Sequence, residues 1–600
     1  MKDNIKANKY KWLLGGILIL GFWFRIVGVN WDSYQHLNPD ERFLTMVLTD
    51  MKWPGLSDFF KTSVSTYNPI NVGYDFFVYG TLPLFVNKLI SAIWLWGDYN
   101  GYLIIGRITS AGLDTLTIAV VFGIGKRVGK FVDRDKDGNG NLVGLVAALF
   151  YSMAVIPIQN SHFFIVDVMG NFLGTLTLLL ALKFIDEPKK WLALLMGGVF
   201  GLAIACKLSL WLLLPAIGFS FFVSLSKTSQ MSRIRSLLIC GGIFLISAYA
   251  CLRVGMPYAF KDFSLLIPDE RFIANVKTVS GMVKGTIDMP PSIQWARTNF
   301  IWPIQEIAIW GWGWFVGLVI FLALGWVTAL TIRTKNKYLI MIFVGLLVPF
   351  GYQALLLAKA QRYFWGAYPI LSLFVGMFFV ANRQKAFIKI LFTSCVLISF
   401  IWTLEFQRIY IFPHSRVTAS EWMNKAIPQG SMVGWELWDD PLPLILPGHA
   451  GGEYPGVEMG LYDDENPQKR DRLVEELVKS DFISISSNRL YGSIPKIPER
   501  YPLATKYYQL LFSGKLGFTK IAEFVVYPGI FNFRVNDDLA EEPFTVYDHP
   551  KVTIFMKNDD FSIGNVRDSF SQIDFQKVRN TLPKDLPASS WSLNLSSDYK

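Results

Sequence analysis

The sequence predicts a polytopic α-helical membrane protein with a C-terminal α/β domain. Of its 600 residues, 52% are hydrophobic and 17% are charged, which is unusual for a soluble globular chain. The apolar residues gather in segments long enough to cross a bilayer as helices. These segments stop near Leu404, and helical and strand patterns alternate after it.

The apolar segments predict about eleven membrane spans. Basic residues concentrate in alternate connections between them, so the positive-inside rule places the N-terminus in the cytoplasm and the C-terminal domain outside. The first segment is expected to be a retained helix, because no small-residue cleavage site follows it. The expected spans are residues 12–29, 103–125, 142–157, 167–185, 191–205, 208–224, 236–253, 308–332, 338–357, 364–381 and 386–404.

This pattern divides the chain into three predicted parts. Residues 1–404 form the membrane region, with outer loops at about 30–102 and 254–307. Residues 405–585 form an extracytoplasmic α/β domain, and residues 586–600, rich in Ser and Asn, form a disordered tail.

Within these parts, short patterns predict local structure. Aromatic stretches of the first outer loop, such as residues 74–79, predict short helices lying in the membrane interface. In the C-terminal domain, residues 470–479 have helical spacing, and residues 481–486 alternate like a strand. Further strands are expected at residues 521–527 and 552–556.

The net charge of +10 does not indicate a nucleic-acid partner. Much of the basic charge lies in short loops between apolar segments, where it sets topology. The four cysteines lie in or beside apolar spans and form no CxxC pair, so we expect small core residues rather than disulfides or a metal site.

An adjacent acid pair, Asp40-Glu41, lies just past the first apolar segment. Carboxylates at the mouth of a membrane helix are costly to desolvate, so they mark a candidate functional site. The alternative is a solvated loop that happens to carry charges. The position of the pair ties any catalytic role to one side of the membrane.

Other ionisable residues share the predicted outer border. A lone arginine such as Arg362 can instead extend its head group to lipid phosphates. The convergence of several such groups on one side favours a functional site. These residues are Arg25, Arg42, His162, Asp167, Lys207, Arg253 and Arg362.

One chemistry suits an acid pair with nearby cations at a membrane surface. A lipid-phosphate sugar carries an anionic leaving group at headgroup depth. Transfer of its sugar needs a carboxylate that deprotonates the acceptor hydroxyl and positive charge that stabilises the departing phosphate. The sugar develops oxocarbenium character, as in glycoside hydrolysis.

The order of these motifs resembles a known family. Arg25, then Asp40-Glu41, then Ser161-His162 with Asp167, then Arg362-Tyr363 is similar to the GT-C superfamily of integral-membrane glycosyltransferases. The type it resembles is the protein mannosyltransferase and aminoarabinose transferase type, called glycosyltransferase family 39, over about residues 10–404. The resemblance implies a GT-C-like fold, a polyprenyl-phosphate-linked sugar donor and inversion of the anomeric centre.

The resemblance also implies roles for individual residues. Asp40 is the expected base with Glu41 beside it, and the donor phosphate is expected at His162, Arg362 and Arg42. The supporting residues are Arg25, Asp167 and Tyr363. The chain departs from the family at His162, where mannosyltransferases commonly have arginine, so a phosphate contact there depends on pH.

Several alternatives stay open. A divalent metal, Mg²⁺ or Mn²⁺, at Glu41 is an alternative to a reaction without a cofactor. The string Pro-Asp-Glu-Arg-Phe occurs at 39–43 and again at 268–272, and we expect the first copy to be catalytic because it directly follows a span. The tail, including residues 542–550, resembles that of uncharacterised bacterial members of the family and not that of the eukaryotic enzymes. The resemblance therefore does not fix the acceptor, and a glycan, a lipid and a protein all stay open.

We therefore expect a multi-pass enzyme of a bacterial plasma membrane, in contact with membrane lipid and without a nucleic-acid partner. One rival is a lipid or ion transporter or flippase, but such proteins usually carry charges mid-span and internal repeats. Another rival is a non-catalytic envelope protein that binds glycans, which leaves Asp40-Glu41 unexplained.

Overall fold

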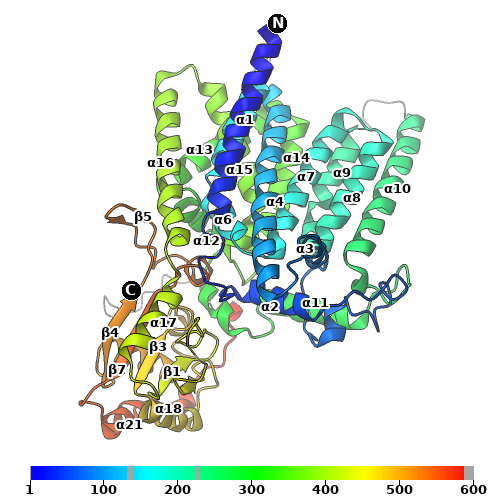
Figure 1. Ribbon diagram of the computed structural model, residues 1–600. Coiled ribbons are helices and arrows are strands. Elements are labelled where there is room, and N and C mark those ends of the chain that lie inside the picture. Colours follow the sequence, from blue (N-terminus) through cyan, green and yellow to red (C-terminus); the bar gives the residue numbers. More distant parts are fainter. Residues whose placement is uncertain (1, 132–138, 225–229, 450, 587–600) are drawn as a thin grey trace.

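The computed structural model describes residues 2–131, 139–224, 230–449 and 451–586. A bundle of long helices carries a smaller sheet domain, and the N-terminus and the sheet domain lie at opposite ends of the bundle (Figure 1). The chain is thus a membrane protein with a C-terminal α/β domain, as predicted. The predicted tail, 586–600, lies outside the described residues apart from Leu586.

A helix or helix pair overlaps each of the predicted spans. Many of them are apolar around their whole circumference, as expected of helices that lie between lipid and other helices. These helices are α1 (Lys2–Ile26), α4 (Tyr99–Val128), α5 (Asn139–Ser152), α6 (Val155–Ser161), α7 (Val166–Asp186), α8 (Lys190–Cys206), α9 (Leu214–Ser224), α10 (Gln230–Gly255), α13 (Trp314–Thr334), α14 (Lys337–Ala354), α15 (Ala367–Asn382) and α16 (Ala386–Ile411).

Fewer helices than eleven pass a strict test for spanning. Within the described residues, six are long and apolar enough to cross a membrane, or seven if the pair α5 and α6, bent by 60°, counts as one span. The helices α8 and α15 have 17 and 16 residues and fall short in length. In the helix α1, Lys9 and Lys11 directly precede the apolar part and Arg25 lies near its end, which leaves too short an apolar stretch to pass this test.

Shorter helices cover the end of the bundle that carries the sheet domain. These are α2 (Pro39–Asp50) and α3 (Leu82–Ile93) of the first outer loop, and α11 (Glu270–Lys284) and α12 (Trp302–Glu306) of the second; α2 and α11 lie across this end in Figure 1. The aromatic stretch 74–79 is not helical, in contrast to the prediction. The apolar helix of this loop, α3, begins after it, at Leu82.

The C-terminal domain contains a five-stranded sheet with the order β2-β1-β3-β7-β4. The strand β1 pairs in parallel with β2 and β3, and β7 pairs antiparallel with β3 and β4. The predicted helix and strands of this domain are confirmed. The elements are α17 (Ser415–Ala426), β1 (Val433–Glu436), β2 (Gly456–Met459), α18 (Pro467–Lys479), β3 (Phe482–Ile485), α19 (Pro502–Phe512), β4 (Phe518–Phe524), β5 (Gly529–Ile530), β6 (Phe533–Arg534), α20 (Glu542–Thr545), β7 (Val552–Lys557) and α21 (Ile563–Ser571).

The segment around α20 fastens this domain to the bundle. The Phe544 ring lies 5.5 Å from that of Trp310 and 5.6 Å from that of Phe406. Asp548 accepts hydrogen bonds from Gln159 Nε2 (3.0 Å) and Tyr410 Oη (2.8 Å). These contacts combine apolar burial with paired polar groups, which fixes the position of the domain over the end of the bundle.

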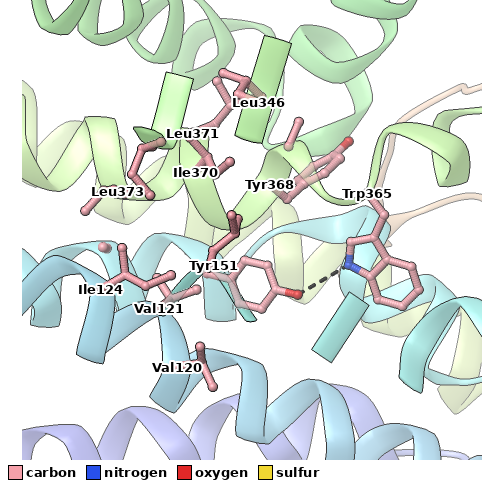
Figure 2. Packing of buried hydrophobic residues seen from close by; sticks show 14 of the residues in the cluster. Val120, Val121, Ile124, Tyr151, Leu346, Trp365, Tyr368, Ile370, Leu371 and Leu373 are labelled. Carbon is pink, nitrogen blue, oxygen red and sulfur yellow. Dashed lines mark hydrogen bonds between the residues drawn. The ribbon is translucent and has the colours of Figure 1, made fainter. Parts of the chain in front are cut away.

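The bundle interior is packed with large apolar side chains from helices far apart in sequence. Figure 2 shows Tyr151 of α5 among Val120 and Val121 of α4 and Ile370 of α15. The Tyr151 hydroxyl lies 3.3 Å from Trp365 Nε1, which donates a hydrogen bond to it within this apolar layer.

Glycines allow the closest helix approach, between α8 and α10. A Cβ at Gly201 would overlap the carbonyl of Ala248, and one at Gly197 would overlap the carbonyl of Phe244. Small residues four apart on one face let helix backbones meet in a membrane. By contrast, a Cβ at Gly218 of α9 would meet nothing within 4 Å.

We predict that Gly201→Ala lowers the stability of the protein by roughly 1–3 kcal/mol, because the added methyl group forces α8 away from α10. Gly218→Ala is the matched control and is expected to be neutral or slightly stabilising, since alanine favours the helix. Thermal unfolding of the purified protein in detergent measures both. Equal melting temperatures for the two variants would contradict this account of the packing.

Candidate active site

Asp40 and Glu41 lie in the first turn of α2. Asn38 caps this helix, because its Oδ1 accepts hydrogen bonds from the N–H groups of Asp40 (3.0 Å) and Glu41 (3.2 Å). Pro39 occupies the first helical position, where a missing N–H costs nothing. Successive residues of a helix point about 100° apart, so the two carboxylates face different surroundings.

Asp40 faces a polar space at the end of the bundle. Its Oδ1 accepts a hydrogen bond from the Tyr79 hydroxyl (2.7 Å), and its Oδ2 accepts one from Arg362 Nη1. The side chains of Asp40 and Arg362 are each 18% exposed. Burial and then the Asp40 carboxylate raise the pKa of Tyr79 well above its usual range, so Tyr79 remains a donor.

A second ion pair lies beside the first. Lys207, which follows α8, pairs with Asp167 in the first turn of α7. The Tyr363 ring lies between the two cations, with Arg362 Cζ at 5.5 Å and Lys207 Nζ at 5.0 Å from its centroid. The structure thus brings together four of the predicted residues with Lys207. We call this set the charged cluster: Asp40, Arg362, Tyr363, Lys207 and Asp167.

An apolar groove begins at the charged cluster. It has a volume of about 100 Å³, and its lining includes Asp167, Lys207 and Arg362 at the polar end. The remaining walls are mostly apolar and come from α7, the turn before α9, and α14. They include Leu178, Leu210, Leu213, Leu346 and Phe350. The groove therefore joins charged groups to a hydrophobic channel.

Glu41 has a different environment from Asp40 and is not available as a base. Its carboxylate is fully buried and accepts hydrogen bonds from Arg107 Nε (2.9 Å) and Nη2 (2.7 Å). It also accepts one from Phe164 N–H (2.8 Å). Arg107 binds Asp32 as well, through two bonds of 2.9 and 2.8 Å. Glu41 therefore anchors α2 rather than facing a substrate.

The expected role of His162 in phosphate binding does not fit the structure. The ring is 1% exposed and stacks on Tyr410 at a centroid distance of 3.5 Å. Its Nδ1 lies 2.8 Å from the Ile158 carbonyl and its Nε2 lies 3.1 Å from the Val27 carbonyl. Both nitrogens are engaged by backbone, so the ring packs the bundle together.

Arg42 and Arg25 also lie apart from the charged cluster. Arg42 donates from Nη2 to Asp440 of the C-terminal domain (2.7 Å) and from Nε to the His36 carbonyl (2.9 Å), so it joins the domain to α2. Arg25 is fully buried in α1 and donates to Asp114 of α4 (2.7 Å). That pair joins α1 to α4, so Arg25 stabilises the bundle and does not contact the charged cluster.

The residues present do not fit a metal at Glu41. Arg107 and the Phe164 N–H already occupy its carboxylate oxygens. Across the described ranges, no group of three or more His, Cys, Asp or Glu side chains is arranged to hold a metal ion.

The two copies of Pro-Asp-Glu-Arg-Phe differ in how their helix begins. In the second copy Asp269 is itself the cap of α11, and its carboxylate accepts from the N–H groups of Arg271 (3.0 Å) and Phe272 (3.2 Å). In the first copy Asn38 caps the helix, which leaves the Asp40 carboxylate free to face Arg362. The identity of the capping residue thus decides whether the aspartate of the string is free: Asn38 caps α2 and frees Asp40, whereas Asp269 caps α11 itself.

Three residues of the site had no predicted role: Lys207, Tyr79 and Arg107. Lys207 ends an apolar segment, a position that calls for an anionic partner. Arg107 lies within the predicted span 103–125, where an unpaired charge would be too costly, so a buried partner was predictable even though its identity was not. Nothing in the sequence singled out Tyr79.

The fold and site define a polytopic membrane protein with a charged cluster at the mouth of an apolar groove. No family model and no curated protein matches the chain. Solved structures do match. One is the apo oligosaccharyltransferase of Archaeoglobus fulgidus, with 11% identity, a TM-score of 0.48 and coverage of 88% of this chain and 75% of that one.

Two further matches are structures with bound lipid phosphates. The same archaeal enzyme, AglB, with an inhibitory peptide and a dolichol-phosphate, has 10% identity, a TM-score of 0.47 and coverage of 88% and 75%. ArnT from Cupriavidus metallidurans bound to undecaprenyl phosphate has 12% identity, a TM-score of 0.43 and coverage of 93% and 99%. At these TM-scores and sequence identities, the similarity to solved structures supports no statement about the function of this chain.

We predict that Glu41→Gln destabilises the protein by about 3 kcal/mol, because it breaks a buried ion pair with Arg107. Asp40→Asn, a matched change one residue away at a partly exposed pair, is expected to cost less than about 1 kcal/mol. Thermal unfolding in detergent measures both variants. A larger loss for Asp40→Asn would show that the roles of the two acids are reversed.

Proposed function

We propose that the protein is an inverting glycosyltransferase that moves a sugar from a polyprenyl-phosphate donor to a hydroxyl group of an acceptor. The observation that carries this proposal is the charged cluster at the mouth of the apolar groove. A lipid-linked sugar phosphate has the same order of parts: an apolar chain, an anionic phosphate and a polar sugar.

The cations of the cluster suit the phosphate. Arg362 Nε is buried and has no hydrogen-bond partner among the described residues, so this donor is available for a ligand. Lys207 is 29% exposed and donates to Asp167, which leaves further ammonium N–H groups for an anion. Two cations on either side of Tyr363 can stabilise the negative charge that develops on a departing phosphate.

The groove suits the lipid. Leucine and phenylalanine side chains line it beyond the charged end, and burial of an isoprenoid chain against them is favourable at about 25 cal/mol per Å². Binding energy from the chain, far from the reacting bond, holds the sugar at Asp40.

Asp40 is the proposed base. In the reaction, the acceptor hydroxyl oxygen attacks the anomeric carbon and its proton passes to the Asp40 carboxylate. The bond from the anomeric carbon to the phosphate oxygen breaks, and the electron pair leaves with the polyprenyl phosphate. Arg362 pairs with Asp40 and borders the groove, so it links the base to the leaving group. Attack from the face opposite the leaving phosphate inverts the anomeric centre.

The proposed setting is a bacterial plasma membrane, with the N-terminus in the cytoplasm and the reaction at the outer face. The basic connections between the apolar segments support this orientation. The transporter alternative has less support: the pair Arg25–Asp114 between α1 and α4 is fully buried, and its charges satisfy each other.

We predict that Asp40→Asn abolishes sugar transfer, because the amide cannot accept the proton of the acceptor hydroxyl. Asp269→Asn, in the second copy of Pro-Asp-Glu-Arg-Phe, is the matched control and is expected to keep activity. Transfer from a radiolabelled polyprenyl-phosphate sugar in purified membranes measures both. Full activity of Asp40→Asn would refute the assignment of the base.

We predict that Lys207→Ala weakens binding of undecaprenyl phosphate by roughly 10- to 100-fold, because it removes a hydrogen bond between charged groups. Lys190→Ala, at the exposed other end of α8, is the control and leaves binding unchanged. Titration of both variants in nanodiscs with the lipid alone measures this. Equal affinities would remove Lys207 from the phosphate site.

A further inference from the structure

A larger cavity lies between the C-terminal domain and the end of the bundle. Its volume is about 620 Å³, and its lining comes from α12, from the loops around Asn488 and Lys496, and from the segment that contains α20. Aromatic side chains, among them Trp302 and Phe518, share its walls with carboxylates and amides. This cavity is separate from the groove at the charged cluster and has no part in donor binding.

Most charged groups of this cavity are already paired. Glu542 accepts from Arg489 Nε (2.7 Å) and Gln294 Nε2 (2.8 Å). Asp537 lies 2.8 Å from His549, and Asp538 pairs with Lys551. These residues hold the C-terminal segments in place, so they shape the walls.

Two buried polar oxygens of the lining are left over. Glu541 is 7% exposed, and its Oε2 has no hydrogen-bond partner in the described chain. Burial raises the pKa of this carboxyl group well above its usual range, which favours the protonated form. The side-chain carbonyl of Asn488 is likewise buried and without a partner. Unsatisfied buried polar atoms are costly, so their presence at a cavity indicates a ligand that forms hydrogen bonds with them.

Lys496 and Glu306 complete the polar part of the lining. Burial lowers the pKa of Lys496 to about 8, and burial raises the pKa of Glu306 to about 7. Near neutral pH this part of the cavity therefore holds groups that both donate and accept hydrogen bonds. Hydroxyl groups, which also donate and accept, match such a lining.

A short segment of the chain joins the wall of this cavity to the charged cluster. Glu541 Oε1 accepts a hydrogen bond from the backbone N–H of Gln361 (2.7 Å). The next residue is Arg362, which binds Asp40. Glu541 and Arg362 also line one small space together with Tyr547. The cavity and the proposed base are therefore neighbours, on the two sides of this segment.

We propose that this cavity binds the acceptor and that the acceptor is a saccharide. The side-chain carbonyl of Asn488 accepts a hydrogen bond from a sugar hydroxyl, Glu541 and Lys496 donate to sugar oxygens, and Trp302 packs on a sugar face. The inference rests on the proposed function, since it names the class of acceptor for the same reaction. A peptide acceptor is the competing class.

Saturation-transfer NMR on the full chain in nanodiscs tests this proposal without any donor. The probes are the methyl glycosides of glucose, galactose, mannose and N-acetylglucosamine, with a Gly-Ser-Gly peptide alongside. We expect saturation transfer to at least one glycoside and none to the peptide. Asn488→Trp, which fills the cavity, abolishes the signal, whereas Asn565→Trp on the exposed face of α21 keeps it.

Glu541→Gln provides a second variant with the same shape. Its amide oxygen keeps the bond to Gln361, and its NH₂ presents a donor to the cavity as the protonated carboxyl group does, so the glycoside signal is expected to remain. Absence of transfer to all four glycosides, or transfer to the peptide alone, overturns the proposal. Glycoside binding in a protein that fails to use any polyprenyl-phosphate sugar would instead refute the proposed function, so the two failures are distinguishable.

Discussion

The buried ion pair between Glu41 and Arg107 is the interaction on which the site depends. It fixes the first turn of α2 against α4, and the bonds of Arg107 to Asp32 extend the anchor to the end of α1. A desolvated ion pair is stable only when its geometry is satisfied, and here all partners are in place. Because Glu41 is held inward, Asp40 turns toward Arg362. The proposed base is thus positioned by its neighbour.

The C-terminal domain adds a second constraint on the same helix. Asp440 accepts hydrogen bonds from Arg42 of α2 (2.7 Å) and from Arg416 of α17 (2.7 Å), so one carboxylate joins the helix to the domain. On the other side, Glu541 binds the backbone next to Arg362. Both members of the pair Asp40–Arg362 therefore have a neighbour tied to the domain. This arrangement explains why a domain without membrane spans belongs to a membrane enzyme of the proposed kind.

Much of the fold and part of the site could be predicted from the sequence. Apolar segments located the helices, since the physical requirement for crossing a bilayer is visible in composition. Asp40, Arg362 and Asp167 were predicted from their place at one border and Tyr363 from the family resemblance, and the structure brings the four together. The structure places Glu41, His162 and Arg42 outside the charged cluster, because their surroundings depend on the direction of each side chain. Spacing along the chain does not carry that direction when helix ends and loops meet in three dimensions.

The central claim is that the charged cluster and the groove hold a polyprenyl phosphate. A cryo-EM structure of the protein in nanodiscs with undecaprenyl phosphate tests it most directly. The account predicts density for the phosphate within hydrogen-bonding distance of Arg362 and Lys207, with the lipid chain along Leu210 and Phe350. Density for the lipid at another face, with this groove closed, would contradict it.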